Sequence, residues 1–164
     1  MGPMRKILIP IDFSEVSEEA LRHAIRCPCA ETKQILLLHV VDPVDILDLG
    51  VLGMEGYEDR MREALIAEAE RKLEALKERY ASEDITIETR VVVDKPWRGI
   101  VQTAVDEGVD AIVMGAHGRG HIAESLLGSA ASRVVAHAPV PVMVVKPPRL
   151  REQLVRRWRR LGAG

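Results

Sequence analysis

Apolar residues fall into two patterns that alternate along the chain. Five short runs are nearly continuous in Val, Ile and Leu: Ile7–Ile11, Ile35–Val41, Ile87–Val93, Ala111–Met114 and Val140–Val145. Strands covered on both faces of a parallel sheet have this composition, whereas half-exposed antiparallel strands alternate apolar and polar residues. The runs therefore predict five buried parallel strands.

The stretches between these runs carry apolar residues three or four positions apart, which is the spacing of amphipathic helices. We expect helices over residues 14–26, 58–80, 94–108 and 129–138. Ser14 or Ser17 is a suitable N-cap for the first helix. Asp94 would cap the third helix, and Gly108 would end it. The segment Asp42–Gly56, with three Gly and one Pro, is predicted to be the longest loop.

Strands and helices that alternate in this order predict an α/β fold, an open five-stranded parallel sheet with helices on both faces. Pro141 cannot donate a hydrogen bond to a neighbouring strand, so the last strand is expected at a sheet edge. Because soluble proteins usually cover an uncharged apolar edge, we expect a homodimer that pairs Val140–Val145 with its own copy. Shielding of this edge by the end of the chain is the alternative.

The composition is that of a single globular domain. The chain has 164 residues, of which 47% are apolar and 29% charged, and this excludes a disordered or low-complexity protein. No apolar run approaches the ~18–20 residues of a membrane-spanning helix. No secretory signal is recognisable, and two cysteines cannot form a disulfide framework. We therefore expect a cytoplasmic location.

Charge is distributed unevenly along the sequence. The whole chain carries −2, but residues 149–164 hold six Arg and one Glu, a net of +5, so residues 1–148 carry −7. Nucleic-acid binding depends on neutralisation of phosphates by Lys and Arg. An acidic domain of this kind predicts no nucleic-acid partner.

Glycines gather after the fourth predicted strand. Gly115, Gly118 and Gly120 are followed, after seven residues, by Gly128 and Ser129 at the start of the last predicted helix. Glycine permits positive φ and lets backbone N–H groups approach an anion without a Cβ in the way.

Three further groups favour the same ligand. The amides of Ser129 and Ala130 would lie at a helix N-terminus, which attracts anions. Arg119 is a suitable charge partner for a terminal phosphate. The set predicts a polyphosphate site.

The position of these glycines in the predicted sheet strengthens that interpretation. Ligands of open parallel sheets bind at the carboxyl ends of the strands, where the winding direction reverses. If the first and fourth strands are neighbours there, Asp12 faces Gly115–Gly120 across the crevice. A carboxylate on one side and an anion site on the other match the polarity of a nucleotide.

The sequence resembles the universal stress protein family over residues 4–148, which we expect to form one nucleotide-binding domain. The resemblance lies in Lys6–Ser14, Leu37–Val40, Met114–Ser129 and Ala138–Lys146. It implies a Rossmann-like, adenine nucleotide alpha-hydrolase-like fold with strand order 3-2-1-4-5, usually in homodimers. Family members with this glycine motif typically bind ATP, so the resemblance implies a dimeric ATP-binding protein of stress response or signalling.

The resemblance also implies roles for individual residues. Asp12 and the backbone of Val40 would hold the adenine and ribose, with Pro10 and Ile11 lining the pocket. The phosphates would be wrapped by two segments: Gly115, His117, Gly118, Arg119 and Gly120, and then Gly128, Ser129 and Ala130. Ala116 stands where many members have Ser, and Asp94 where Gly is common. The ligand could therefore be ATP, ADP or AMP.

No dedicated metal or catalytic site is visible in the sequence. Asp12 has no second acid beside it to hold Mg²⁺, so any Mg²⁺ would arrive on the nucleotide. His117 and His121 have the spacing of a helical zinc pair, but the glycines between them make a helix improbable. No Walker-type motif or nucleophile–base pair is present. Slow ATP hydrolysis is the alternative function.

The basic tail, residues 149–164, has apolar residues at helical spacing from Leu150 to Leu161, with arginines around them. A basic amphipathic helix can lie on an anionic membrane or bind a partner protein. In that case the chain would be an interaction module that recruits its partner through the tail. The other interpretation is that Trp158 docks on the domain or its dimer mate while the arginines stay solvated.

Overall fold

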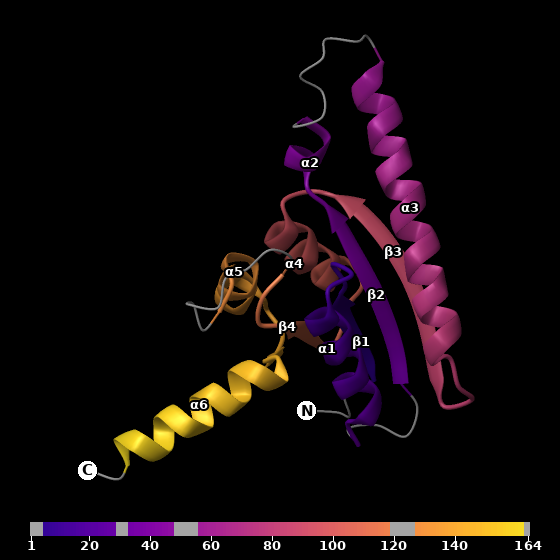
Figure 1. Cartoon of the computed structure of the whole chain (residues 1–164). Helices are drawn as coiled ribbons and strands as arrows, with labels where there is room; N and C mark the ends of the chain where they lie inside the picture. Colours follow the sequence, from indigo (N-terminus) through magenta and orange to yellow (C-terminus); the bar gives the residue numbers. More distant parts are fainter. Residues whose placement is uncertain (1–4, 29–32, 48–55, 119–126, 163–164) are drawn as a thin grey trace.

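The computed structural model of the chain describes residues 5–28, 33–47, 56–118 and 127–162. Its five strands form one sheet in the order β3-β2-β1-β4-β5, and every neighbouring pair is parallel (Figure 1). The strands are β1 (Lys6–Pro10), β2 (Lys33–Val41), β3 (Ile85–Val93), β4 (Ala111–Gly115) and β5 (Val142–Val145). The predicted fold class and strand order are confirmed.

Helices cover both faces of this sheet (Figure 1). The described residues form α1 (Glu15–Arg26), α2 (Pro43–Leu47), α3 (Tyr57–Tyr80), α4 (Pro96–Asp106), α5 (Ser129–His137) and α6 (Pro148–Leu161). Residues of α1 and α3 pack with Ile7 and Ile9 of β1 on one face. Residues of α4 and α5 pack with Leu8 on the other face. Because successive residues of a strand point to opposite faces, both kinds of position are apolar, which explains the continuous runs.

Of the N-caps predicted for α1 and α4, one is confirmed and the other is wrong. Ser14 is the N-cap of α1 and its side chain accepts a hydrogen bond from the Ser17 amide at 3.3 Å, as predicted. The predicted capping role of Asp94 is wrong, because the N-cap of α4 is Lys95. Proline favours an extended residue immediately before it, and Pro96 therefore fixes the helix start one residue later than expected. Asp94 instead accepts a hydrogen bond from the Lys95 amide at 2.7 Å.

Two other boundaries also differ from the prediction. The expected loop Asp42–Gly56 contains a short helix, α2, whose first turn is stabilised by the Asp42 carboxylate through the Val44 amide at 3.0 Å. Residues 48–55 of that segment lie outside the described residues. The last strand begins at Val142 rather than Val140. Pro141 lies just before it and accepts a hydrogen bond from the Ile112 amide, since proline can accept but not donate.

β5 lies at the edge of the sheet, as the proline predicted. Met143 in this strand is 45% exposed, and α6 leads away from the sheet rather than along it (Figure 1). The alternative in which the end of the chain shields the edge is therefore wrong for the described residues. The homodimer through this edge stays a prediction. Within the described ranges, no helix is both long and apolar enough to cross a bilayer.

A charge cluster around Glu107 makes a pH-dependent contribution to stability. Glu107 follows α4 and forms ion pairs with Lys6 of β1, at 2.8 Å, and with Arg90 of β3. Its pKa is lowered from 4.5, chiefly by the hydrogen bond from Lys6 and further by Arg90. A carboxyl group whose pKa is lower in the folded than in the unfolded protein stabilises the fold fully at a pH above its unfolded-state pKa. This contribution is lost as the pH falls through its folded-state pKa.

We predict that Glu107→Gln lowers the thermal unfolding midpoint at pH 7. The difference from the unsubstituted protein should shrink as the pH falls below 4.5, because both proteins then lack the paired carboxylate. Thermal melts followed by circular dichroism over a pH series measure this. A difference that stayed constant down to pH 3 would contradict the electrostatic origin.

Candidate functional site

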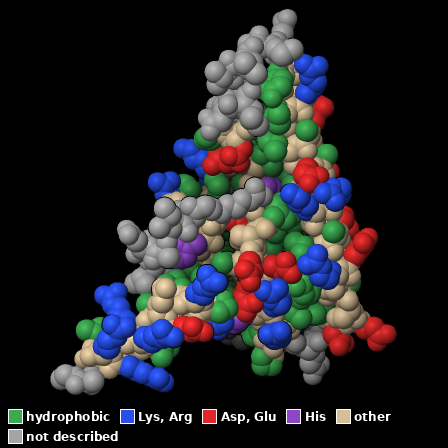
Figure 2. Space-filling view, viewed as in Figure 1, with side chains coloured by type: hydrophobic (Ala, Val, Ile, Leu, Met, Phe, Trp, Pro, Cys, Tyr) green, Lys and Arg blue, Asp and Glu red, His purple; other side chains and the backbone are tan. Residues whose placement is uncertain are grey.

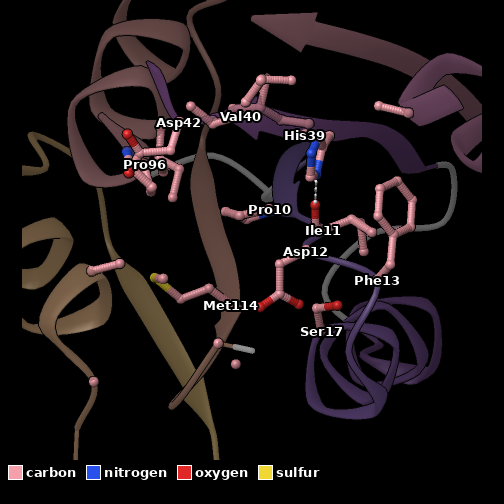
Figure 3. Close-up of a pocket in the computed structure, with 18 of the residues that line it drawn as sticks. Pro10, Ile11, Asp12, Phe13, Ser17, His39, Val40, Asp42, Pro96 and Met114 are labelled. Atoms are coloured by element: carbon pink, nitrogen blue, oxygen red, sulfur yellow. Dashed lines mark hydrogen bonds between the residues drawn. The ribbon is translucent and has the colours of Figure 1, made fainter. Parts of the chain in front are cut away.

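A cavity of about 410 Å³ opens at the carboxyl ends of β1, β2 and β4. Every described member of the predicted site set lines it: Pro10, Ile11, Asp12, Val40, Gly115, His117, Gly118, Gly128, Ser129 and Ala130. Figure 3 shows Pro10, Asp12, Val40 and Met114 converging on this space from the three strands. Arg119 and Gly120 lie outside the described residues. The volume is within the ~300–1,000 Å³ of ordinary small-molecule pockets.

The end of β1 presents a carboxylate to the cavity. The strand ends at Pro10, and the Ile11 amide makes one further hydrogen bond to Leu38 of β2 at 2.7 Å. Phe13 then adopts a left-handed φ of 64°. Such a conformation costs free energy for a residue with a Cβ and is often found at functional sites. It lets Asp12 accept a hydrogen bond from the Ser14 amide at 3.0 Å.

β2 extends beyond the end of β1 and presents backbone groups to the same cavity. Pairing between the two strands stops at Leu38, while pairing with β3 continues to Val41. The Leu38 carbonyl faces β1, and the Val41 carbonyl accepts a hydrogen bond from Asp94 on the β3 side. Since backbone groups alternate sides along a strand, those of Val40 face the space beyond β1. That space is the cavity.

The side chain of Val40 is held from the opposite direction by α4. A Cβ added at Gly99 of α4 would lie 2.9 Å from a Val40 methyl carbon. Glycine at this helical position therefore lets α4 approach β2 closely enough to fix Val40. Sequence analysis did not select Gly99, and an isolated glycine inside a helical pattern is the signal that could have indicated it.

The described glycines after β4 lie in close contact with neighbouring groups and do not have positive φ. Gly115, Gly118 and Gly128 are not among the described residues with positive φ, so that part of the prediction is wrong. A Cβ at Gly115 would lie 2.7 Å from a methyl carbon of Val16 in α1. A Cβ at Gly118 would lie 2.8 Å from Asp12 Oδ2. The loop after β4 therefore lies directly against the Asp12 carboxylate.

A hydrogen bond joins the two glycine segments. The Gly128 amide donates to the Ala116 carbonyl at 2.7 Å, and a Cβ at Gly128 would approach that oxygen to 3.2 Å. This amide is consequently engaged within the protein; the amides that the sequence predicts as phosphate donors are the next two, those of Ser129 and Ala130. Gly128 is the N-cap of α5 and no side chain caps the helix. The amides of Ser129 and Ala130 follow in the first turn, where N–H groups lack helical acceptors.

α3 supplies a wall of the cavity that sequence reasoning missed. Leu65, Glu68, Ala69 and Lys72 line it. Lys72 Nζ lies 5.1 Å from the centre of the Phe13 ring. The pKa of Glu68 is lowered to about 2 by the hydrogen bond from Arg71, and further by Lys72. The spacing of these four residues was visible in the sequence, but it predicts only that they share a helix face.

His39 forms the adjoining part of that wall. Its Nδ1 lies 2.7 Å from the Ile11 carbonyl oxygen, shown as the dashed line in Figure 3. Its ring lies 4.8 Å from the Phe13 ring, centre to centre. The imidazole is half-buried, and this contact holds it at the edge of the cavity. Among the described residues, no group of three or more His, Cys, Asp or Glu side chains could hold a metal ion.

The packing at Gly115 predicts a stability effect. Gly115→Ala would place a methyl group against both the side chain and the backbone of Val16, at 2.7 and 3.3 Å. Overpacking of this kind costs about 1–3 kcal/mol. Chemical denaturation should show a loss of this size, whereas Gly162→Ala, whose added Cβ has only one neighbour at 3.6 Å, should leave stability within about 0.5 kcal/mol. Equal stability of the two variants would contradict the packing role.

The sheet order and the cavity at the carboxyl ends of β1 and β4 define a doubly wound α/β protein with a cavity at its switch point, which is where folds of this class bind their ligands. The family model of the universal stress protein family matches residues 3–146. The chain belongs to the universal stress protein family. α6 lies beyond the matched residues.

Individual relatives agree with this membership. The chain is similar to universal stress protein MJ0577 of Methanocaldococcus jannaschii, with 38% identity over 87% of this chain and 94% of the relative. It is 34% identical to universal stress protein MJ0531 of the same organism, over 88% of this chain and 84% of the relative. The solved structure of MJ0577 superposes with a TM-score of 0.79, covering 88% of this chain and 97% of that one.

More distant solved structures share the fold. A universal stress protein family protein from Arabidopsis thaliana, described with AMP bound, is 20% identical with a TM-score of 0.61, over 87% of this chain and 91% of that one. A universal stress protein described in complex with cAMP is 23% identical with a TM-score of 0.55, over 88% and 98%. At these identities the comparison establishes the common architecture.

Proposed function

We propose that this chain binds ATP, or ADP or AMP, in the cavity described above and acts as a dimeric stress-response or signalling protein. One observation carries the proposal. The hydrogen bond between Gly128 and Ala116 holds the start of α5 beside the loop that lies against Asp12. A carboxylate and a set of helix N-terminal amides thereby share one small cavity. The carboxylate can accept hydrogen bonds from hydroxyl groups, and the amides can donate hydrogen bonds to phosphates.

The adenine would lie at the β2 side of the cavity. The lining there is largely apolar, with Pro10, Val40, Pro96, Ile100 and Met114. The Val40 backbone offers an N–H donor and a carbonyl acceptor, which can pair with the edge of a base. The Asp12 carboxylate would accept hydrogen bonds from the ribose hydroxyls. This assignment of Pro10, Ile11, Asp12 and Val40 is supported by their common position around the cavity.

The phosphates would lie at the α5 side. The amides of Ser129 and Ala130 carry the partial positive charge of the helix N-terminus, and the Ser129 hydroxyl could donate a further hydrogen bond. We propose that Gly118, Arg119 and Gly120 close over the phosphates, with Gly115 and His117 beside them. Asp42 and Asp45 line the opposite side, where their charge would repel phosphate. Mg²⁺, where present, would be carried by the nucleotide.

We propose that binding, rather than rapid turnover, is the output. Three of the four carboxylates that line the cavity in the described part of the chain already accept hydrogen bonds that shape the fold: Asp12 from Ser14, Asp42 from Val44, and Glu68 from Arg71. A general base must instead reach the proton that it removes. Slow hydrolysis would be recognised as phosphate release that exceeds the release by a variant that cannot bind ATP.

The proposed dimer would pair β5 with the β5 of a second copy, as the exposed Met143 in this edge strand supports. A cytoplasmic location stays a prediction from the sequence. The fold itself is compatible with an adenine nucleotide, because solved universal stress proteins described with AMP or cAMP share it.

The direct test of ligand identity is mass spectrometry of the small molecule that co-purifies with the protein. We expect an adenine nucleotide in stoichiometric amount after gentle purification, and its exchange for added ATP. Recovery of a guanine nucleotide, or of a ligand without phosphate, would contradict the proposal. An empty preparation would be followed by titration with ATP, ADP, AMP and adenosine, and the absence of saturable binding to all four would also contradict it.

A further inference from the structure

α6 is joined to the domain only near its start. Leu150 in the first turn is buried, with 8% exposure, whereas Trp158 and Leu161 are 74% and 67% exposed. Figure 1 shows the helix projecting away from the sheet as an arm. The interpretation in which Trp158 docks on its own domain is therefore wrong. The arm leaves a row of large apolar side chains in water, and exposed apolar surface of this kind marks an interaction site.

The apolar residues of this arm lie together. Leu150, Leu154, Trp158 and Leu161 are spaced by four, four and three residues, which places them along one helix face. Val155, Arg157 and Arg159 surround the exposed Leu154, Trp158 and Leu161 on this helix. Figure 2 shows green and blue atoms side by side along the projecting arm at the lower left, which is α6.

The charge of the arm is strongly positive. Arg149, Arg151, Arg156, Arg157, Arg159 and Arg160 are accompanied by a single acid, Glu152, so residues 149–164 carry +5 against −7 in residues 1–148. An acidic body is repelled by an anionic surface, and the arm is the part that can make contact. Arginine side chains beside an apolar face can reach headgroup phosphates while their stems lie on the apolar boundary.

We propose that α6 binds the surface of an anionic lipid bilayer, with Leu154, Trp158 and Leu161 entering the headgroup boundary. Helices that lie in this boundary combine a large apolar face with arginines around it, and tryptophan is favoured at that depth. Charge attraction to anionic lipids adds to apolar burial. The helix would lie flat on the surface, because its 14 residues extend about 21 Å, which is shorter than the hydrocarbon core of about 30 Å.

Two other occupants fit the same residues less well. Pairing of α6 with α6 of a second copy would bring two arms of +5 together. Docking on the body of a second copy would need a matching apolar patch. In the described part of the chain the other exposed large apolar residues are spread over four elements, as Val44, Val105, Val135 and Met143. A nucleic acid would use the arginines but not the leucines, because its affinity rests on phosphate contacts.

The test uses the full chain in co-sedimentation with two kinds of vesicle, phosphatidylcholine alone and phosphatidylcholine mixed with phosphatidylglycerol. We expect binding to the mixed vesicles that salt weakens, and little binding to phosphatidylcholine. The matched variant exchanges neighbours, Trp158→Arg with Arg159→Trp, so composition and net charge stay constant while the apolar face is interrupted. It should bind the mixed vesicles roughly 10- to 100-fold more weakly, as expected for loss of one buried aromatic side chain.

A second variant, Arg156→Gln with Arg160→Gln, should lose roughly 20- to 30-fold, from about 1 kcal/mol per arginine near the surface. Both variants should bind nucleotide as the unsubstituted protein does, which separates this inference from the proposed function. Equal binding to both vesicles, or equal binding by the exchanged variant, would overturn it. Light scattering gives a further test: if neither vesicle is bound and the exchanged variant has a lower mass than the unsubstituted protein, α6 would be assigned to contact with a second copy. Binding to nucleic acid but to neither vesicle would also overturn the inference.

Discussion

Gly128→Val is expected to abolish nucleotide binding while the protein stays folded. The added side chain would meet the Ala116 carbonyl oxygen, 3.2 Å from the position of its Cβ, and the neighbouring His117 Cα at 3.4 Å. Both are backbone atoms, which cannot rotate away as a side chain can. The start of α5 must then move from the Ala116 segment, and the 2.7 Å hydrogen bond between them is lost.

The size of the effect follows from the number of phosphate contacts that depend on this geometry. Two hydrogen bonds to a charged group, at about 1.5–3 kcal/mol each, correspond to a loss of about 100-fold or more in affinity. Isothermal titration of nucleotide-free protein with Mg·ATP measures it. Gly162→Val is the matched control, since Gly162 lies at the end of α6 and a Cβ there has its single near neighbour at 3.6 Å. If Gly128→Val bound Mg·ATP with unchanged affinity, the start of α5 would not be the phosphate site.

Asp12→Asn is expected to weaken binding about 10- to 100-fold, because hydrogen bonds from ribose hydroxyls to a carboxylate are worth about 1.5–3 kcal/mol. Asparagine keeps an oxygen that can accept the Ser14 amide, now at 3.0 Å, so the entry to α1 should be preserved. The variant thus separates the charge of Asp12 from its structural contact. Titration with ATP and with adenosine should show losses of similar size, since the ribose is common to both.

Asp110→Asn is the control for this second prediction. Asp110 also accepts backbone hydrogen bonds through its carboxylate, from Arg5 and Lys6 at 2.9 and 2.8 Å. It lies at the opposite edge of the sheet, where β1 and β4 begin. Its substitution should leave nucleotide affinity unchanged. If Asp12→Asn lost affinity only for phosphates without adenosine, such as tripolyphosphate, Asp12 would lie at the phosphates and not at the ribose.

The buried parallel strands could be predicted from the apolar runs, because strands covered on both faces have this composition, whereas the strand order was implied by the resemblance to the universal stress protein family. Leu8 and its neighbours Ile7 and Ile9 are all buried, on alternate faces, and few other structures require that pattern. The element ends were less predictable. Lys95 rather than Asp94 caps α4 because the proline that follows decides the boundary, a local steric effect stronger than the capping preference.

The sequence indicated residues that line the cavity, but not the packing contacts that each of them makes. The described glycines of the motif, Gly115, Gly118 and Gly128, line the cavity, yet Gly115 lies against Val16 of α1 and Gly128 against Ala116. A sequence shows where the glycines are, but it does not show which neighbouring atoms occupy the space that a side chain would need there. The α3 wall with Lys72 was missed for a related reason, since a helix face can be recognised from spacing while its partner cannot.

Isothermal titration of nucleotide-stripped protein with Mg·ATP decides whether the cavity binds an adenine nucleotide. We expect saturable binding of one nucleotide per chain, competition by ADP and AMP, and loss of the signal in Gly128→Val, a variant that should be less stable but still folded at the temperature of the titration. A folded protein that gives no saturable heat with any adenine nucleotide, or that binds equally well when the Gly128–Ala116 contact is disrupted, would contradict it.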